Sequence, residues 1–131
     1  MPVVLIIEDN DSSRFVIRSV LERAGYDVVE AATPDEALEQ CCGEYAARLV
    51  GVVSDVMLGM LPGSEVARRI REMHPRLPIL FVSGFPSDHL IDRGLLHPSD
   101  PFLQKPFPAR VLVNHLEALL NHHEKANSRG N

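Results

Sequence analysis

The feature that most restricts the fold is the segment LVGVVSD at residues 49–55, an apolar run that ends in one carboxylate. Continuous apolar runs of this length are typical of strands that are buried on both faces of a parallel sheet. Residues 3–7 and 79–82 have the same character, and the segments at 27–31 (DVVEA) and 102–104 (FLQ) contain shorter apolar runs. The sequence therefore predicts five strands, at least three of them deeply buried.

Segments with helical periodicity or capping signals separate these strands. Helices are expected to begin near Asn10, Thr33, Ser64 and Pro108. Gly25 should end the first helix, and the Gly/Pro-punctuated residues 56–63 are expected to form a loop. Between residues 85 and 101 the pattern is weak, so only two helical turns are expected at 87–93.

Strands that alternate with helices predict an α/β domain, with a parallel sheet between two helical layers. The 131 residues are enough for one such domain and too few for two. We place the domain at residues 1–121 and expect the polar residues 122–131 to form a disordered tail.

Composition excludes several classes of protein. The net charge of −5 argues against direct nucleic-acid binding, which usually needs a basic patch. No apolar stretch approaches the roughly 20 residues of a membrane span, and the N-terminus lacks a signal peptide's basic region. Cys41 and Cys42 are adjacent, which makes a disulfide improbable, so we expect a reduced, cytoplasmic protein without membrane insertion.

Polar side chains stand where the predicted strands end. Glu8 and Asp9 follow the first strand, Asp55 ends the third, Ser83 follows the fourth and Lys105 follows the fifth. In open parallel sheets, functional groups gather beyond the carboxyl ends of the strands. We therefore expect three carboxylates, one hydroxyl and one ammonium group at the same edge of the sheet.

This set of groups suits phosphoryl chemistry. Three neighbouring carboxylates repel, which raises at least one pKa, and a hard divalent cation such as Mg²⁺ relieves the repulsion. Asp55 is ionised at neutral pH and could attack phosphorus to form an acyl phosphate. Lys105 and Ser83 could then contact the phosphoryl oxygens. The residues alone thus predict a Mg²⁺-assisted phosphoacceptor.

The same residues resemble the receiver domain of two-component response regulators. The resemblance rests on Glu8-Asp9, on Asp55 with its MLGMLPG loop, on Ser83-Gly84 and on Lys105-Pro106-Phe107, and it covers residues 3–120. It implies a flavodoxin-like, doubly wound (βα)5 fold with strand order 2-1-3-4-5.

The resemblance also implies the roles of the acidic residues. Asp55 would accept a phosphoryl group from the phosphohistidine of a histidine kinase or a histidine phosphotransfer protein. Asp9 would bind Mg²⁺ directly, and Glu8 would bind it mainly through water. The backbone carbonyl of Met57 would complete the protein ligands, together with Asp55.

Three further residues would carry the response to phosphorylation. Lys105 would contact the phosphoryl group, Ser83 would move toward it as the switch, and Phe102 would change rotamer with it. The Lys105-Pro106 peptide bond is cis in this family. The resemblance implies a signalling domain rather than an enzyme with turnover, since its chemistry is self-catalysed transfer to Asp55 and slow autodephosphorylation.

Departures from the family pattern concern the signalling output. The fourth helix, which helps to form the dimer surface of DNA-binding members, is degraded between residues 87 and 101. Phe102 lacks a tyrosine hydroxyl, and Gly59 stands where proline is frequent. The weak fourth helix and the FLQKPF ending at residues 102–107 look more like receivers of hybrid sensor kinases or stand-alone receivers without DNA-binding output. The sequence is also compatible with a weak homodimer.

Two other functions use similar groups. A small Mg²⁺-dependent phosphatase would also use an aspartyl nucleophile, but it usually carries a second acid two residues later, where this chain has Met57. A flavodoxin-like cofactor binder would need a loop rich in Ser, Thr and Gly after the first strand. Residues 8–11 are instead mostly acidic and would repel a phosphate.

Overall fold

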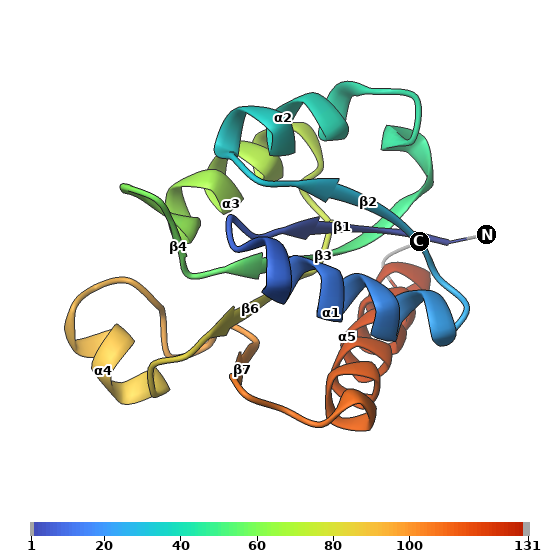
Figure 1. The fold of residues 1–131 in the computed structure, drawn as a ribbon. Coiled ribbons are helices and arrows are strands. Elements are labelled where there is room, and N and C mark those ends of the chain that lie inside the picture. The colour runs from blue at the N-terminus through green and yellow to red at the C-terminus, as the bar shows by residue number, and fades with distance from the viewer. Residues whose placement is uncertain (1, 130–131) are drawn as a thin grey trace.

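A computed structural model describes residues 2–129 of the chain, and the side chains of residues 2–122. Five parallel strands form the central sheet in the order β2-β1-β3-β6-β7 (Figure 1). Their bounds are β1 Val3–Ile7, β2 Asp27–Ala31, β3 Leu49–Asp55, β6 Ile79–Ser83 and β7 Phe102–Gln104. Since β6 and β7 are the fourth and fifth strands of this sheet, the predicted order 2-1-3-4-5 is confirmed.

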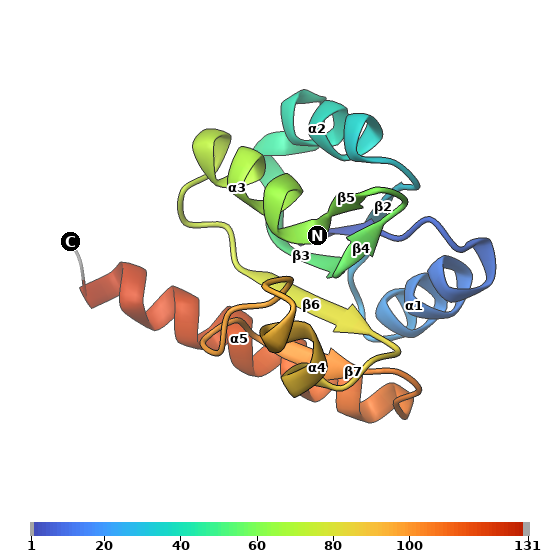
Figure 2. The ribbon, with the colours of Figure 1, turned by 90° about the vertical axis from the view of Figure 1, so that its left-hand side faces the viewer.

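Helices cover both faces of the sheet, and the three layers are visible in Figure 2. The helices are α1 Asp11–Arg23, α2 Pro34–Cys42, α3 Gly63–Met73, α4 Ser87–Asp92 and α5 Ala109–Arg129, with a 3-10 turn at Ala46–Arg48. One core lies under α2, α3 and α4 and the other under α1 and α5. The structure is therefore the doubly wound α/β sandwich that the alternating pattern predicts.

Capping residues set the helix starts as the sequence predicts. The Asn10 side chain accepts a hydrogen bond from the backbone N–H of Ser13 at 2.8 Å, which places the start of α1 directly after β1 and its acidic pair. The Thr33 hydroxyl accepts from the N–H of Glu36 at 3.1 Å, and Pro34 occupies the first turn of α2. Gly25 has a φ of 97° and follows α1, as expected for a terminating glycine.

The segment after Asp55 differs from the expected loop. It forms a small antiparallel hairpin of β4 Met57–Leu58 and β5 Leu61–Pro62. Gly59 has a φ of 65°, which lets the chain reverse within two residues. The interpretation as a simple loop was wrong because two-residue strands carry too little pattern to be recognised.

The C-terminal part of the chain also differs in detail. Helix α4 is as short as expected, with six residues. Helix α5 continues to Arg129, past residue 121, where a polar tail was expected to begin. Residues 130–131 lie outside the described residues, and the division into a domain and a tail stays a prediction. Within residues 2–129, the structure contains no helix with the length and apolar character to span a bilayer.

Candidate functional site

The register of the sheet brings the predicted site residues to one edge. Ile7 pairs with Ser54, so Glu8 and Asp55 follow on neighbouring strands. Asp55 pairs with Val82, and Ser83 with Gln104, so Ser83 and Lys105 come next along the same edge. All four strands run in the same direction, so their carboxyl ends meet here.

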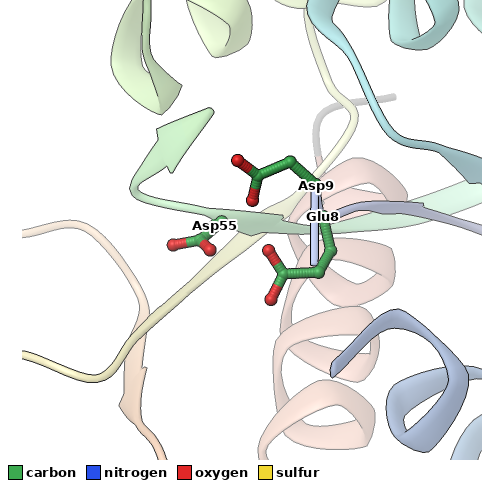
Figure 3. A group of neighbouring side chains, drawn as sticks. All are labelled: Glu8, Asp9 and Asp55. Atoms are coloured by element: carbon green, nitrogen blue, oxygen red, sulfur yellow. The ribbon is translucent and has the colours of Figure 1, made fainter. Parts of the chain in front are cut away.

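Three carboxylates form a cluster at this edge. Glu8, Asp9 and Asp55 each offer one oxygen, and these oxygens lie within 4.8 Å of one another. Figure 3 shows the three side chains converging on a common space beyond β1 and β3. Glu8 is buried, Asp55 is partly buried and Asp9 is exposed, so the cluster reaches from the core to solvent.

Glu8 is the buried member of the cluster. Its Oε1 accepts a short hydrogen bond from Nζ of Lys105, and its side chain is only 1% exposed. Within the part of the chain that the structure describes, Oε2 of Glu8 is buried and has no hydrogen-bond partner. Burial raises the pKa of Glu8 above the usual range, the carboxylate of Asp55 raises it further, and Lys105 opposes this effect.

Asp55 lies between this buried pair and solvent. Its side chain is 17% exposed, and its Oδ2 lies 3.5 Å from Nζ of Lys105. The N–H of Met57 lies 3.5 Å from its Oδ1. Lys105 therefore contacts both Glu8 and Asp55 and partly neutralises the cluster, and the partial exposure of the Asp55 side chain gives a reacting group access to it from solvent.

Ser83 and Phe102 lie beside the cluster. The Ser83 hydroxyl is buried at the end of β6 and accepts a hydrogen bond from the N–H of Phe85 at 3.1 Å. Phe102 is half-buried on β7 and packs against the core under α2, α3 and α4. The Lys105-Pro106 bond is cis, as the resemblance implies. The switch roles of Ser83 and Phe102 stay predictions.

Two residues that shape the site were missed from the sequence. Gly63 begins α3, and a Cβ there would lie 2.3 Å from the Asp55 carbonyl oxygen, so the close approach requires glycine. Arg14 reaches back from α1 and donates to the carbonyl of Glu8 at 2.8 Å. The Pro-Gly pair at residues 62–63 is a possible signal for the first, whereas the sequence offers none for the second.

The residues present fit a hard divalent cation. Carboxylate oxygens are the ligands that Mg²⁺ prefers. The site combines two carboxylates with a third whose buried oxygen has no hydrogen-bond partner among the described residues. A cation would satisfy that oxygen and relieve the repulsion within the cluster. Glu8, Asp9 and Asp55 could supply side-chain ligands, and the role of the Met57 carbonyl stays a prediction.

Comparison with known proteins agrees with this geometry. The sequence model of the response regulator receiver domain matches residues 4–117. The chain is 34% identical over 118 residues to the response regulator receiver protein CpdR of Brucella abortus, covering 90% of this chain and 95% of that protein. The fold and the site thus define the class of protein: a doubly wound α/β domain with an acidic site at the carboxyl edge of its sheet. The chain belongs to the response regulator receiver domain family, a family of signalling domains.

Longer relatives share the same domain. The sensor kinase CckA of Brucella abortus is 37% identical over 120 residues, covering 89% of this chain and 12% of that protein. The regulator PhoP of Bacillus subtilis is 33% identical over 125 residues, covering 94% of this chain. The chain spans about half the length of PhoP, at 50%.

Solved structures show the same fold. The chemotaxis protein CheY4 of Vibrio cholerae matches with a TM-score of 0.78 at 29% identity, covering 91% of this chain and 98% of that chain. The receiver domain of the hybrid histidine kinase CckA matches with a TM-score of 0.73 at 28% identity, covering 90% and 98%.

Proposed function

We propose that this chain is a phosphoacceptor switch in a two-component phosphorelay, with Asp55 as the acceptor and Mg²⁺ as the cofactor. The observation that carries the proposal is the position of Asp55. Its carboxylate lies in the cluster with Glu8 and Asp9, 3.5 Å from Lys105 Nζ, and is still reachable from solvent. Mg²⁺ bound by these carboxylates would neutralise charge on the incoming phosphoryl group.

The transfer itself needs no general base. An ionised Asp55 oxygen would attack phosphorus as the phosphorus–nitrogen bond of a phosphohistidine breaks, and the electron pair would return to the imidazole. Lys105 is a cation at hydrogen-bonding reach of a new phosphoryl oxygen. Ser83 would exchange its present hydrogen bond from the Phe85 N–H for one that it donates to the phosphoryl group. Phe102 would follow this movement by repacking.

The donor partner in this proposal is a histidine kinase or a histidine phosphotransfer protein. The hybrid-kinase or stand-alone type, without direct nucleic-acid contact, is supported by the six-residue α4. The identities of 37%, 34% and 33% to a sensor kinase, a receiver protein and a transcriptional regulator do not separate these types. We place the reaction in the cytoplasm, which is consistent with the free thiols of Cys41 and Cys42.

The proposal is tested by intact mass after incubation with acetyl phosphate and Mg²⁺. The parent should gain one phosphoryl group, and Asp55→Asn should gain none. Asp35→Asn, at the exposed start of α2, is the matched control and should be modified like the parent. An unmodified parent, or equal modification of Asp55→Asn, would contradict the proposal.

The same samples distinguish the phosphatase alternative. A phosphatase would release phosphate continuously from several unrelated monoesters, and the release would require Asp55. Once acetyl phosphate has been removed, the proposed switch should instead release about one phosphate per phosphorylated protein, at the rate at which the adduct disappears. Size-exclusion chromatography of the phosphorylated parent tests whether the chain is a hybrid-kinase or stand-alone type of receiver. The short α4 of such a receiver predicts a monomer or a weak dimer.

A further inference from the structure

Glu8, which directly follows β1, is held on both sides of its backbone. The N–H of Glu8 donates to the carbonyl of Ala31 on β2 at 3.0 Å. The carbonyl of Glu8 accepts from Nη1 of Arg14 at 2.8 Å. That carbonyl belongs to the peptide unit that joins Glu8 to Asp9, so its direction sets the plane from which the Asp9 side chain departs.

Arg14 is itself fixed in place by two further contacts. Its Nη2 donates to Oδ1 of Asp11 at 2.6 Å, and its Nε lies 3.6 Å from Oε1 of Glu30 on β2. The side chain is 18% exposed, so the guanidinium is largely enclosed. The planar fork of the guanidinium is suited to several simultaneous contacts of this kind, whereas an ammonium offers a single point of charge.

We infer that Arg14 is a positioning residue for the cation site: by holding the Glu8–Asp9 peptide, it keeps both carboxylates turned toward Asp55. The inference rests on the proposed function, because it concerns the same Mg²⁺ site. Arg14 donates to the backbone rather than to a ligand oxygen, so it acts through Glu8 and Asp9. Partners of this outer kind orient metal ligands and commonly control metal affinity.

Arg18 is a matched control on the same helix. Its Nη1 contacts Oε2 of Glu30 at 2.5 Å, and its Nε contacts Glu22 at 3.1 Å. Arg14 and Arg18 thus carry the same charge and share Glu30, but only the contact of Arg14 reaches the Glu8 carbonyl among those described. A comparison of the two separates backbone positioning from charge and from helix packing.

The direction of the change in Mg²⁺ affinity also distinguishes a role of Arg14 as a positive charge from a role in positioning the ligands. If Arg14 acted only as a positive charge, its removal would reduce repulsion toward Mg²⁺ and tighten binding. If it positions the ligands, Arg14→Gln should weaken Mg²⁺ binding by about tenfold, the lower end for outer partners of metal ligands. Arg14→Lys keeps the charge and loses the fork, so it should also weaken binding.

The experiment is a calorimetric titration of the full chain with MgCl₂, with thermal unfolding in chelator measured in parallel. We expect about tenfold weaker binding for Arg14→Gln, weaker binding for Arg14→Lys, and less than about twofold change for Arg18→Gln. Equal changes in the Arg14→Gln and Arg18→Gln variants, or tighter binding in Arg14→Gln, would overturn the inference while leaving the proposed function intact. A parent that binds no Mg²⁺ would overturn both.

A loss of stability is separated from a loss of positioning by a second readout. The amide resonance of Asp9 in the metal-free protein should shift in both Arg14 variants and stay in place in Arg18→Gln. If an Arg14 variant binds weakly only because it unfolds, its melting temperature will lie near the titration temperature and Arg14→Lys will restore normal affinity. That result would also overturn the inference.

Discussion

Replacing Asp55 with asparagine should stabilise the protein in the absence of Mg²⁺, because it removes one charge from a crowded acidic cluster. The cluster oxygens lie within 4.8 Å of one another. Two negative charges at that distance repel by about 0.9 kcal/mol in water and by about 3.5 kcal/mol at an effective dielectric constant of about 20. Asp55 takes part in two such pairs, with Glu8 and with Asp9.

The ion pair with Lys105 opposes this gain. At the 3.5 Å between Lys105 Nζ and Asp55 Oδ2, the attraction is about 1.2 kcal/mol in water and about 4.7 kcal/mol at the lower dielectric constant. The net gain for Asp55→Asn is therefore about 0.5–2 kcal/mol with all groups ionised. For a domain of this size that corresponds to a rise in melting temperature of about 2–8 °C.

The assay is thermal and urea unfolding followed by circular dichroism, at pH 7.5 and low salt with a chelator present. Glu117→Gln removes the same charge from the exposed surface of α5 and serves as the control, with an expected change within about 0.5 kcal/mol. With Mg²⁺ at ten times its dissociation constant, the parent should gain about 1.4 kcal/mol and Asp55→Asn much less. The difference in the free energy of unfolding between Asp55→Asn and the parent should then become smaller or change sign.

Two results would refute this reasoning. A lower stability of Asp55→Asn than of the parent in chelator would mean that the Lys105 pair outweighs the carboxylate repulsion. An equal gain in Glu117→Gln would mean that the effect comes from the net charge of −5 rather than from the cluster.

Three further predictions concern the same site. Lys105→Met leaves the buried carboxylate of Glu8 without its cation. The free energy of unfolding, measured with urea, should therefore fall by about 3 kcal/mol at neutral pH and by less at pH 5. An unchanged urea midpoint would contradict this prediction. The pKa of Glu8 is raised in the folded state. Between the unfolded and the folded pKa, the folded protein therefore holds a proton that the unfolded chain has released. The free energy of unfolding in chelator should fall as the pH rises from 4.5 through the raised pKa. Urea midpoints measured across this range check the slope, and a flat profile would exclude it. Gly63→Ala would place a Cβ 2.3 Å from the Asp55 carbonyl oxygen and should cost about 1–3 kcal/mol. Gly84→Ala, where a Cβ meets open space, should change stability by less than about 0.5 kcal/mol.

Much of the fold follows from local patterns. Apolar runs identified all five strands of the sheet, and the capping side chains of Asn10 and Thr33 marked two helix starts correctly. These signals depend on a few neighbouring residues, so they are present in the sequence itself. The hairpin after Asp55 and the length of α5 were missed, since short strands and helix ends carry weak local signals.

The membership of the site was also determined by the sequence, because the ends of parallel strands must meet at one edge. Glu8, Asp9, Asp55, Ser83 and Lys105 could be named on that basis alone. The burial, the ion pairs and the backbone contacts of each of these residues were decided by the tertiary structure. Only the packed sheet brings Lys105 to a glutamate 97 positions away and links the carbonyl of that glutamate to Arg14. It also buries the glutamate so that one of its oxygens has no partner within the described part of the chain. Burial and distance set the charges and the pKa of the site, and both arise only when distant segments pack together.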